Sequence, residues 1–323
     1  MPPLVLYPPT KESDGTAASE NGAAVFGGKE YVMKRRQNFQ ENVIHGIFLL
    51  LGLVTVAFVL LITVYLVISG IPAISKIGFW DFMFGKTWAS THSTDPQFGI
   101  LPFILSSIYG TAGALVLGVP IGFFAAVYLS KMASAKVKAV ITSAVSLLAG
   151  IPSVVYGLVG MLVLVPGIRK VFHVADGASL LAAILVLTVM ILPSIIKVSI
   201  TALDAVPAEY EDASLALGAT PVETYFRVSV PAAKSGIAAA IVLGVGRAVG
   251  EATAVMMVSG NAANMPSLLQ SVRFLTTAVA SEMSYAGEGL QRQALFSIAL
   301  VLFLFIMLIN GILNFFIKKD KEA

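Results

Sequence analysis

Long apolar stretches, separated by short polar segments, dominate the chain after its first 40 residues. A helix needs about 20 residues to cross the roughly 30 Å of hydrocarbon in a bilayer, and six stretches are long enough. They cover residues 46–68, 99–130, 139–168, 177–196, 236–260 and 294–317. The pattern therefore predicts an all-α integral membrane protein with six transmembrane helices.

This pattern divides the chain into three parts. Residues 1–40 are rich in Pro, Gly, Ser and Glu and lack an apolar run long enough for a signal sequence, which predicts a flexible tail. Residues 41–98 hold the first transmembrane helix and an outer loop whose clustered aromatic residues suit the membrane interface. Residues 99–323 hold the other five helices and a long cytoplasmic loop at positions 204–231.

Composition and charge agree with this interpretation. Of the residues, 57% are hydrophobic and only 12% are charged, against about 25% charged in a typical soluble domain. Placing the N-terminus inside assigns most of the 21 Lys and Arg residues to the cytoplasmic side, which predicts that both termini are cytoplasmic. The absence of cysteine and the scattered positions of the three histidines favour no metal site, and nothing predicts a catalytic group or a nucleic-acid partner.

Arg247 and Glu251 are the only charged residues between positions 236 and 260, in the middle of the fifth predicted helix. An Arg at this depth costs about 2.5 to 3.5 kcal/mol on insertion scales, so it normally faces a cavity, a partner or a solute. Residues four apart share a helical face, so the two side chains are expected to reach each other. They form either a structural pair that neutralises itself or part of an anion path, in which the planar guanidinium donates two parallel hydrogen bonds to an oxyanion. The glycines around them predict that this segment packs closely against a neighbouring helix rather than facing lipid.

Ser153 and Tyr156 follow Pro152 in the third predicted helix, which Pro152 is expected to break, freeing a backbone carbonyl. Their hydroxyl groups are candidates for the same path. The residues alone favour the alternative in which these groups satisfy the local backbone or a neighbouring helix.

The long cytoplasmic loop carries the start and stop signals of two short helices. Pro207 suits a first helical position, and Gly218 suits the C-terminal cap of the helix that follows it. Thr220 and Glu223 have the spacing of a capping box, which predicts the start of a second helix. The two helices are expected to form a projecting elbow that either docks onto another protein or lies on lipid headgroups.

The elbow resembles the EAA loop of ABC importer permeases, whose pattern is Glu-Ala-Ala, three residues, Gly, nine residues and Ile-x-Leu-Pro. The matching positions are Asp212, Ala213, Ser214, Gly218, Val228, Val230 and Pro231, with Glu211 beside the acidic position. The resemblance implies a permease core of the MetI type. It also implies that Glu211, Asp212, Ala213, Ser214 and Gly218 belong to a coupling helix that sits in a cleft of a separate ATPase subunit.

Further motifs resemble the phosphate permeases of this family, and the PstC type in particular. They are Phe-Gly-Lys-Thr-Trp at 84–88, Phe-Gly-Ile-Leu-Pro-Phe at 98–103, Ile-Pro-Ser-Val-Val-Tyr-Gly at 151–157 and Gly-Val-Gly-Arg-Ala-Val-Gly-Glu at 244–251. The resemblance implies a subunit that imports inorganic phosphate across a prokaryotic inner membrane and has no cofactor or enzymatic activity of its own. The implied partners are a second permease subunit of the PstA type, a dimer of PstB-type ATPase subunits that bind ATP and Mg²⁺, and an extracytoplasmic phosphate-binding protein of the PstS type.

Two alternative functions remain open. An ABC permease for sulfate, molybdate or phosphonate differs from a phosphate permease only in its substrate, so substrate tests must separate them. A proton-coupled secondary transporter that uses Arg247 and Glu251 is expected to work alone and to contain internal repeats, which the sequence does not show.

Overall fold

A computed structural model describes the backbone of residues 20–92 and 94–322 and the side chains of residues 41–92 and 94–315. The chain divides into two units, residues 1–63 and 64–323. The first unit consists, over its described residues, of the beginning of α1 (Glu20–Ile77). Residues 20–40, which belong to the predicted tail, are therefore helical, and residues 1–19 of that tail lie outside the described residues.

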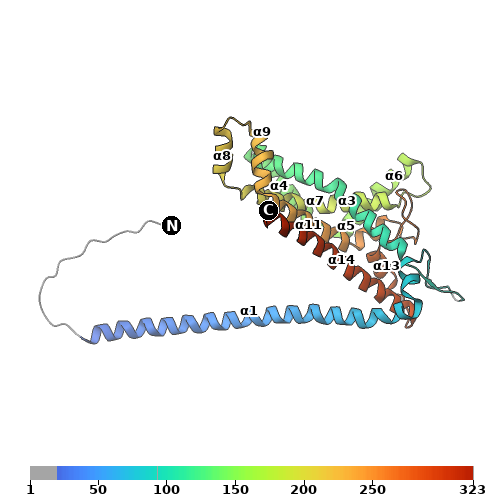
Figure 1. Cartoon of the computed structure of the whole chain (residues 1–323), viewed down its shortest axis with the longest axis horizontal. Helices are drawn as coiled ribbons and strands as arrows, with labels where there is room; N and C mark the ends of the chain where they lie inside the picture. The colour runs from blue at the N-terminus through green and yellow to red at the C-terminus, as the bar shows by residue number, and fades with distance from the viewer. Residues whose placement is uncertain (1–19, 93, 323) are drawn as a thin grey trace. The chain divides into compact units, whose positions relative to one another are not determined.

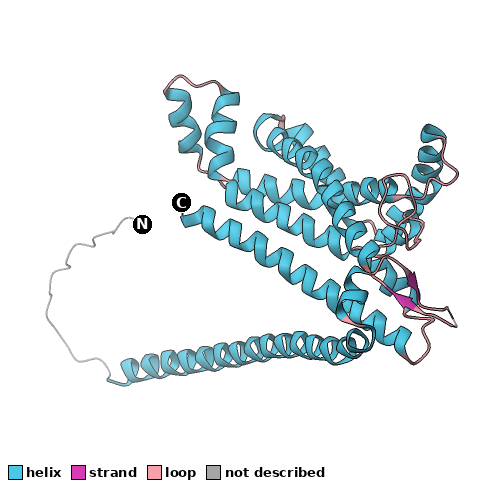
Figure 2. Ribbon diagram, turned by 45° about the vertical axis from the view of Figure 1, so that its right-hand side comes forward, coloured by secondary structure: helices cyan, strands magenta, loops and turns pink. Residues whose placement is uncertain are grey.

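The second unit contains the remaining helices and one short hairpin of two strands (Figure 2). The three elements marked η are single π-helical turns. In chain order the elements after α1 are α2 (Phe79–Phe84), β1 (Trp88–Ala89), β2 (Gln97–Phe98), α3 (Leu101–Val127), η1 (Tyr128–Met132), α4 (Ala135–Gly150), α5 (Ser153–Val159), η2 (Gly160–Leu164), α6 (Val165–Phe172), α7 (Leu180–Asp204), α8 (Ala208–Ala216), α9 (Pro221–Thr224), η3 (Tyr225–Ser229), α10 (Val230–Ala232), α11 (Lys234–Gly250), α12 (Thr253–Val258), α13 (Leu275–Glu282) and α14 (Leu290–Glu322).

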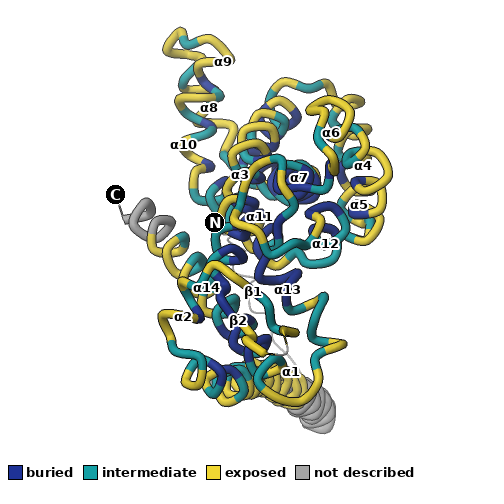
Figure 3. Tube along the Cα trace, turned by 90° about the vertical axis from the view of Figure 1, so that its right-hand side faces the viewer, coloured by how far each residue is buried: buried dark blue, intermediate teal, exposed yellow. Residues whose placement is uncertain are grey.

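Helix α7 lies at the centre of this unit, with α3, α4, α5, α11 and α12 around it (Figure 3). Its most apolar window is 61% buried, whereas no other candidate span exceeds 33%. Helix α3 approaches α7 closely because glycines face it. A Cβ atom at Gly118 would lie 2.7 Å from Ile191, and one at Gly122 would lie 2.8 Å from Ile195. Small residues that let two helical backbones approach are the usual means of packing helices in a membrane.

The structure confirms the all-α fold and gives five to six candidate membrane spans. Five helices are long and apolar enough by themselves, and the sixth span counts only if α11 is joined to residues 221–232 across a bend of 71°. The predicted number of six is therefore approximate.

Two of the predicted helices are broken. The third, over residues 139–168, stops at Gly150 and restarts at Ser153, since Ile151 and Pro152 are extended and Pro disfavours a helical conformation in the residue before it. Its candidate span is Ser153–Phe172. The fifth, over residues 236–260, ends at Gly250, and a separate helix α12 begins at Thr253.

The elbow and the β1–β2 hairpin lie at opposite ends of the second unit (Figures 1 and 2). At the hairpin end, the Glu282 carboxylate forms an ion pair with Arg273 and accepts hydrogen bonds from Trp88 Nε1 and Ser90 Oγ. Trp88, on β1 of the hairpin, is buried, whereas Trp80 on α2 is exposed. The aromatic residues predicted to line the membrane interface thus divide between a packed interior and a free surface.

Candidate functional site

Arg247 lies on α11 and points toward α7. Its Nη1 donates a hydrogen bond to Ser194 Oγ across 3.4 Å, and the side chain is half-buried. This bond is long for an N–H···O contact. Ser194 directly follows Pro193 inside α7, so one hydroxyl on the central helix and the guanidinium on α11 are brought together.

One side of α11 beside Arg247 is open. A Cβ atom at Gly246 or Gly250 would meet no neighbouring element within 4 Å, whereas one at Gly244 would lie 3.1 Å from Ile195. The predicted close packing of these glycines therefore holds for Gly244 within this chain and not for the other two. Arg247 stands between the packed side and the open side, where a solute or another subunit has access to it.

Glu251 lies directly after the end of α11 and does not pair with Arg247, so the expectation that the two side chains pair is wrong. Because α11 ends at Gly250, Glu251 is extended, and its carboxylate accepts a hydrogen bond from the backbone amide of Ala254 at 3.0 Å. Its carbonyl accepts another from Thr276 Oγ1 at 2.9 Å. Among the side chains that the structure describes, no carboxylate forms an ion pair with Arg247. Glu251 instead stabilises the helix break.

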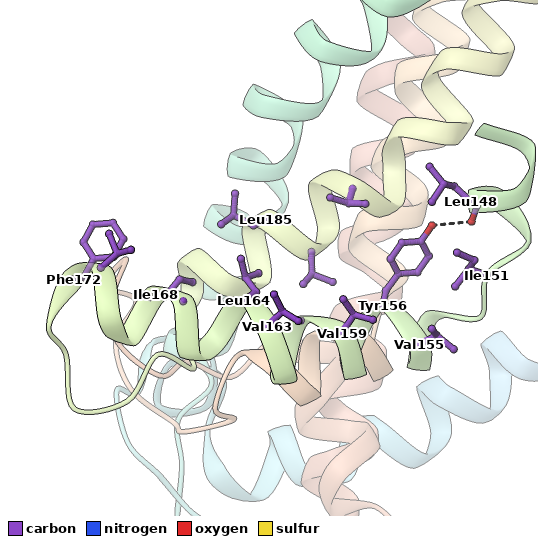
Figure 4. Close-up of a pocket in the computed structure, with 15 residues that line it drawn as sticks. Leu148, Ile151, Val155, Tyr156, Val159, Val163, Leu164, Ile168, Phe172 and Leu185 are labelled. Carbon is purple, nitrogen blue, oxygen red and sulfur yellow. Dashed lines mark hydrogen bonds between the residues drawn. The ribbon is translucent and has the colours of Figure 1, made fainter. Parts of the chain in front are cut away.

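Tyr156 lies near Arg247, and its hydroxyl group has a partner of its own. It is within range of an electrostatic interaction with the guanidinium, and it donates a 2.8 Å hydrogen bond to the carbonyl of Leu148 near the end of α4 (Figure 4). Pro152, four residues after Leu148, has no N–H to donate to that carbonyl, as the sequence predicted. The carbonyl accepts instead from the Tyr156 hydroxyl and, at 3.1 Å, from the backbone amide of Ile151. Ser153, the first residue of α5, is half-buried and has no hydrogen bond from its side chain among the described residues.

A groove of about 660 Å³ runs past Tyr156 along α5, η2, α6 and α7 (Figure 4). Its walls are aliphatic and aromatic, and neither Arg247 nor Ser194 contributes to them. An anion loses its hydration in such a place without gaining a polar partner. The groove therefore suits lipid or an apolar protein surface, and the anion chemistry lies beside it at Arg247.

The elbow, residues 205–233, is a hairpin of two helical segments whose local signals agree with the sequence. Thr220 and Glu223 form the predicted capping box, and Gly218 has φ +90°, which explains the need for glycine after α8. The backbone amide and hydroxyl of Thr220 hold the pKa of the Glu223 carboxyl below its usual range. Ser214 Oγ and Thr224 Oγ1, 2.9 Å apart, join the two segments.

The acidic residues of the elbow face different ways. Asp212 and Ala213 are exposed, and Leu217 at the tip is 90% exposed, so these residues form the free surface of the elbow. Glu211 turns inward, where it forms an ion pair with Lys131 at 2.6 Å and accepts a hydrogen bond from Ser229 Oγ at 2.8 Å.

Several partners at these sites were not found from the sequence. Each of them contacts a predicted site residue that is distant along the chain; the four partners are Ser194, Thr276, Lys131 and Ser229. Local spacing carries no information on contacts at such separations. Leu217 had a weak signal, since it is a large apolar residue directly before the capping glycine of a polar loop.

Residues 118–319 match the family described as binding-protein-dependent transport system inner membrane component. The chain belongs to this permease family. The permease is 38% identical over 291 residues to the probable ABC transporter permease protein YqgH of Bacillus subtilis, covering 87% of this chain and 94% of the relative. It is 32% identical over 315 residues to the phosphate transport system permease protein PstC of Haemophilus influenzae, covering 90% and 98%.

The fold of the permease is also that of a solved transporter. An inward-facing structure of the MetNI methionine ABC transporter superposes with a TM-score of 0.51 at 21% identity, covering 69% of this chain and 94% of that chain. The resemblance found from the sequence is thereby confirmed for both family and fold. As a member of this family, the permease is a membrane-spanning subunit of an ABC importer that works with a separate ATPase and a binding protein.

Proposed function

We propose that this permease forms half of the membrane path by which an ATP-driven importer brings inorganic phosphate into a prokaryotic cell. The observation that carries the proposal is the guanidinium of Arg247, which lies beside an open helical face, 3.4 Å from the Ser194 hydroxyl, and pairs with no carboxylate of the described residues. The similarity to relatives named as phosphate permeases supports phosphate over sulfate, molybdate or phosphonate.

Arg247 is suited to a divalent oxyanion at mid-membrane. The guanidinium stays charged at any working pH and offers two parallel donors to two oxygens of one phosphate. Ser194 adds a hydroxyl group that can donate a hydrogen bond to a third oxygen or accept one from the P–OH group of HPO₄²⁻. Tyr156, Ser153 and Glu251 line or support the same path, with Glu251 as the residue whose carboxylate can accept a hydrogen bond from the P–OH group of HPO₄²⁻.

The proposed partners follow from the surfaces that the chain leaves open. A PstA-like second permease covers the open side of α11 and the apolar groove along α5 and α7, which completes the path between two subunits. A dimer of PstB-like ATPases, which binds ATP and Mg²⁺, takes the elbow on the cytoplasmic side, and a PstS-like protein delivers phosphate from outside. Both termini are cytoplasmic in this arrangement, and the permease has no nucleotide site of its own.

Reconstitution of the complex tests this function. The permease, its second permease and the ATPase subunits are co-purified, reconstituted with the binding protein, and assayed for ATP hydrolysis in phosphate and in sulfate. We expect phosphate alone to stimulate hydrolysis. Equal stimulation by sulfate, or stimulation by sulfate alone, contradicts the assignment of the substrate.

The permease reconstituted by itself tests the secondary transporter. We expect no phosphate uptake into liposomes that contain only this chain, with or without a proton gradient. Uptake driven by a proton gradient in those liposomes contradicts dependence on the ATPase.

A further inference from the structure

A partly buried ion pair joins the elbow to the membrane core. Lys131 Nζ lies 2.6 Å from Glu211 Oε1, and the two side chains are only 10% and 20% exposed. The same carboxylate oxygen accepts the hydrogen bond from Ser229 Oγ, so Glu211 bridges both segments of the elbow and the end of α3. Lys131 sits in η1, the π-helical turn that continues α3.

A second contact reaches the same helix. The ring of Phe226 in η3 lies 6.4 Å from the ring of Phe124 in α3, measured between centroids. The first segment of the elbow therefore meets the α3 end through Glu211, and the second segment meets it through Phe226. Any rigid displacement of the elbow acts on this end of α3.

The end of α3 is in turn fastened to α7. Asp204, the last residue of α7, accepts a 2.6 Å hydrogen bond from Ser130 Oγ and forms an ion pair with Lys138 at 2.9 Å. Helix α7 carries Ser194, the hydrogen-bond partner of Arg247. A continuous series of contacts thus runs from the elbow through η1 and α7 to the candidate anion site.

The chain itself also joins the elbow to the membrane core, through the non-helical residues 205–207 after α7 and through a bend before α11. Residues 221–232 and α11 meet at an angle of 71°, with a non-helical residue, Ala233, between them. A bent joint at a single residue absorbs rotation, so it transmits movement poorly compared with a side-chain contact held at both ends.

Stability alone does not account for charges at this place. Taking an ion pair out of water is costly, and replacing such a pair by apolar residues is often neutral or stabilising. What the charges supply is a fixed register, because Glu211 can satisfy both Lys131 and Ser229 in only one position of α8 against η1.

We propose that Lys131 and Glu211 are positioning residues that transmit movement of the elbow to α3 and α7, while Asp212, on the exposed face, contacts the ATPase. This inference rests on the proposed function in one respect, namely that the elbow is where the ATPase docks. The two neighbouring acidic residues therefore differ in role, since Asp212 serves binding and Glu211 serves transmission.

The test uses the complete complex and a reporter that does not depend on the substrate. The chain contains no cysteine, so Gly246→Cys places a single thiol on the open face beside Arg247. ATP is expected to change the rate at which a maleimide labels this thiol on the permease chain. Lys131→Gln and Glu211→Gln are expected to reduce that ATP-dependent change about fivefold or more, the range of a typical coupling energy, while the ATPase subunits still co-purify.

Three further variants separate transmission from simple loss of structure. The charge exchange Lys131→Glu with Glu211→Lys is expected to restore much of the response, because the pair is re-formed. Lys136→Gln removes an exposed charge nearby on α4 and is expected to leave the response unchanged. Asp212→Asn is expected to weaken co-purification of the ATPase.

The outcomes distinguish this inference from the proposed function. A full ATP response in Glu211→Gln overturns the inference, as does loss of the ATPase from Glu211→Gln to the same degree as from Asp212→Asn. Failure of the charge exchange to restore any response, in a complex that still assembles, also overturns it. Absence of phosphate stimulation in the wild-type complex counts against phosphate as substrate and leaves the labelling result to decide the role of the ion pair.

Discussion

At the scale of the residue, the proposed function depends mainly on the position of the Arg247 guanidinium. Arg247 was found from the sequence because a charge inside an apolar stretch is costly and therefore conspicuous. Its hydrogen bond to Ser194 was not found, since the two residues lie 53 positions apart and meet only when α7 and α11 pack. The expected pairing with Glu251 was wrong because α11 ends at Gly250 and the Glu251 carboxylate accepts a hydrogen bond from the Ala254 amide instead.

The shape of the Arg247 side chain is expected to matter as well as its charge. Arg247→Lys keeps the charge and loses the planar fork, so one of two parallel hydrogen bonds to phosphate is lost. A bond to a charged group contributes about 1.5 kcal/mol or more, which corresponds to roughly tenfold weaker binding. We expect the KM for phosphate uptake by the reconstituted complex to rise by about this factor. An unchanged KM would mean that the guanidinium does not contact phosphate.

At the scale of the element, the capping signals of the sequence predicted the ends of the short helices correctly. Of the two helix breaks, the sequence predicted only one. The capping box and Gly218 follow from a few adjacent residues, so they could be predicted. Pro152 likewise marked the break between α4 and α5. The break after Gly250 has no proline, and it is held by Thr276, 25 positions from Glu251. Hydropathy therefore indicated one helix over residues 236–260 where the chain forms two.

The contact between α5 and α12 depends on a glycine. A Cβ atom at Gly157 would lie 2.7 Å from Met257 Sδ and 2.9 Å from the Cα of Ala254, and the latter belongs to backbone that cannot turn aside. We expect Gly157→Ala to displace α12 and to lower the free energy of unfolding by about 1 to 3 kcal/mol, the usual cost of overpacking. Thermal unfolding of the purified complex measures this.

The matched control is Gly167→Ala on α6, where an added Cβ atom would meet nothing within 4 Å. It is expected to leave the midpoint of unfolding unchanged or slightly raised. If both variants unfold at the wild-type temperature, then α5 and α12 are not packed as described.

At the scale of the whole molecule, the sequence predicted the fold class and the family. The structure adds the contacts that stabilise the hairpin end and the elbow end of the second unit. Helix number and apolar length follow from the bilayer, so they could be predicted within one span. The networks at the hairpin end and the elbow end join residues far apart in the chain, such as Trp88 and Glu282 or Lys131 and Glu211. The hydrophobic periodicity of the sequence does not predict such long-range pairs.

The network at the hairpin end is expected to stabilise that end measurably. Glu282→Gln removes the charge that pairs with Arg273 and leaves a partly buried guanidinium without a carboxylate. Leaving such a group without its partner costs about 1 to 3 kcal/mol. We expect a lower midpoint of thermal unfolding and faster proteolysis of the loop between β1 and β2. Asp81→Asn, on the exposed surface of α2, serves as the control, and equal behaviour of the two variants would contradict a structural role for the ion pair.

We propose that phosphate crosses the membrane along a path that requires Arg247. ATP-dependent uptake of radiolabelled phosphate into proteoliposomes tests this proposal, with the wild-type complex compared with one that carries Arg247→Gln and retains its ATPase subunits. We predict uptake by the wild type and none above background by the variant. Near-normal uptake by the variant would contradict the claim.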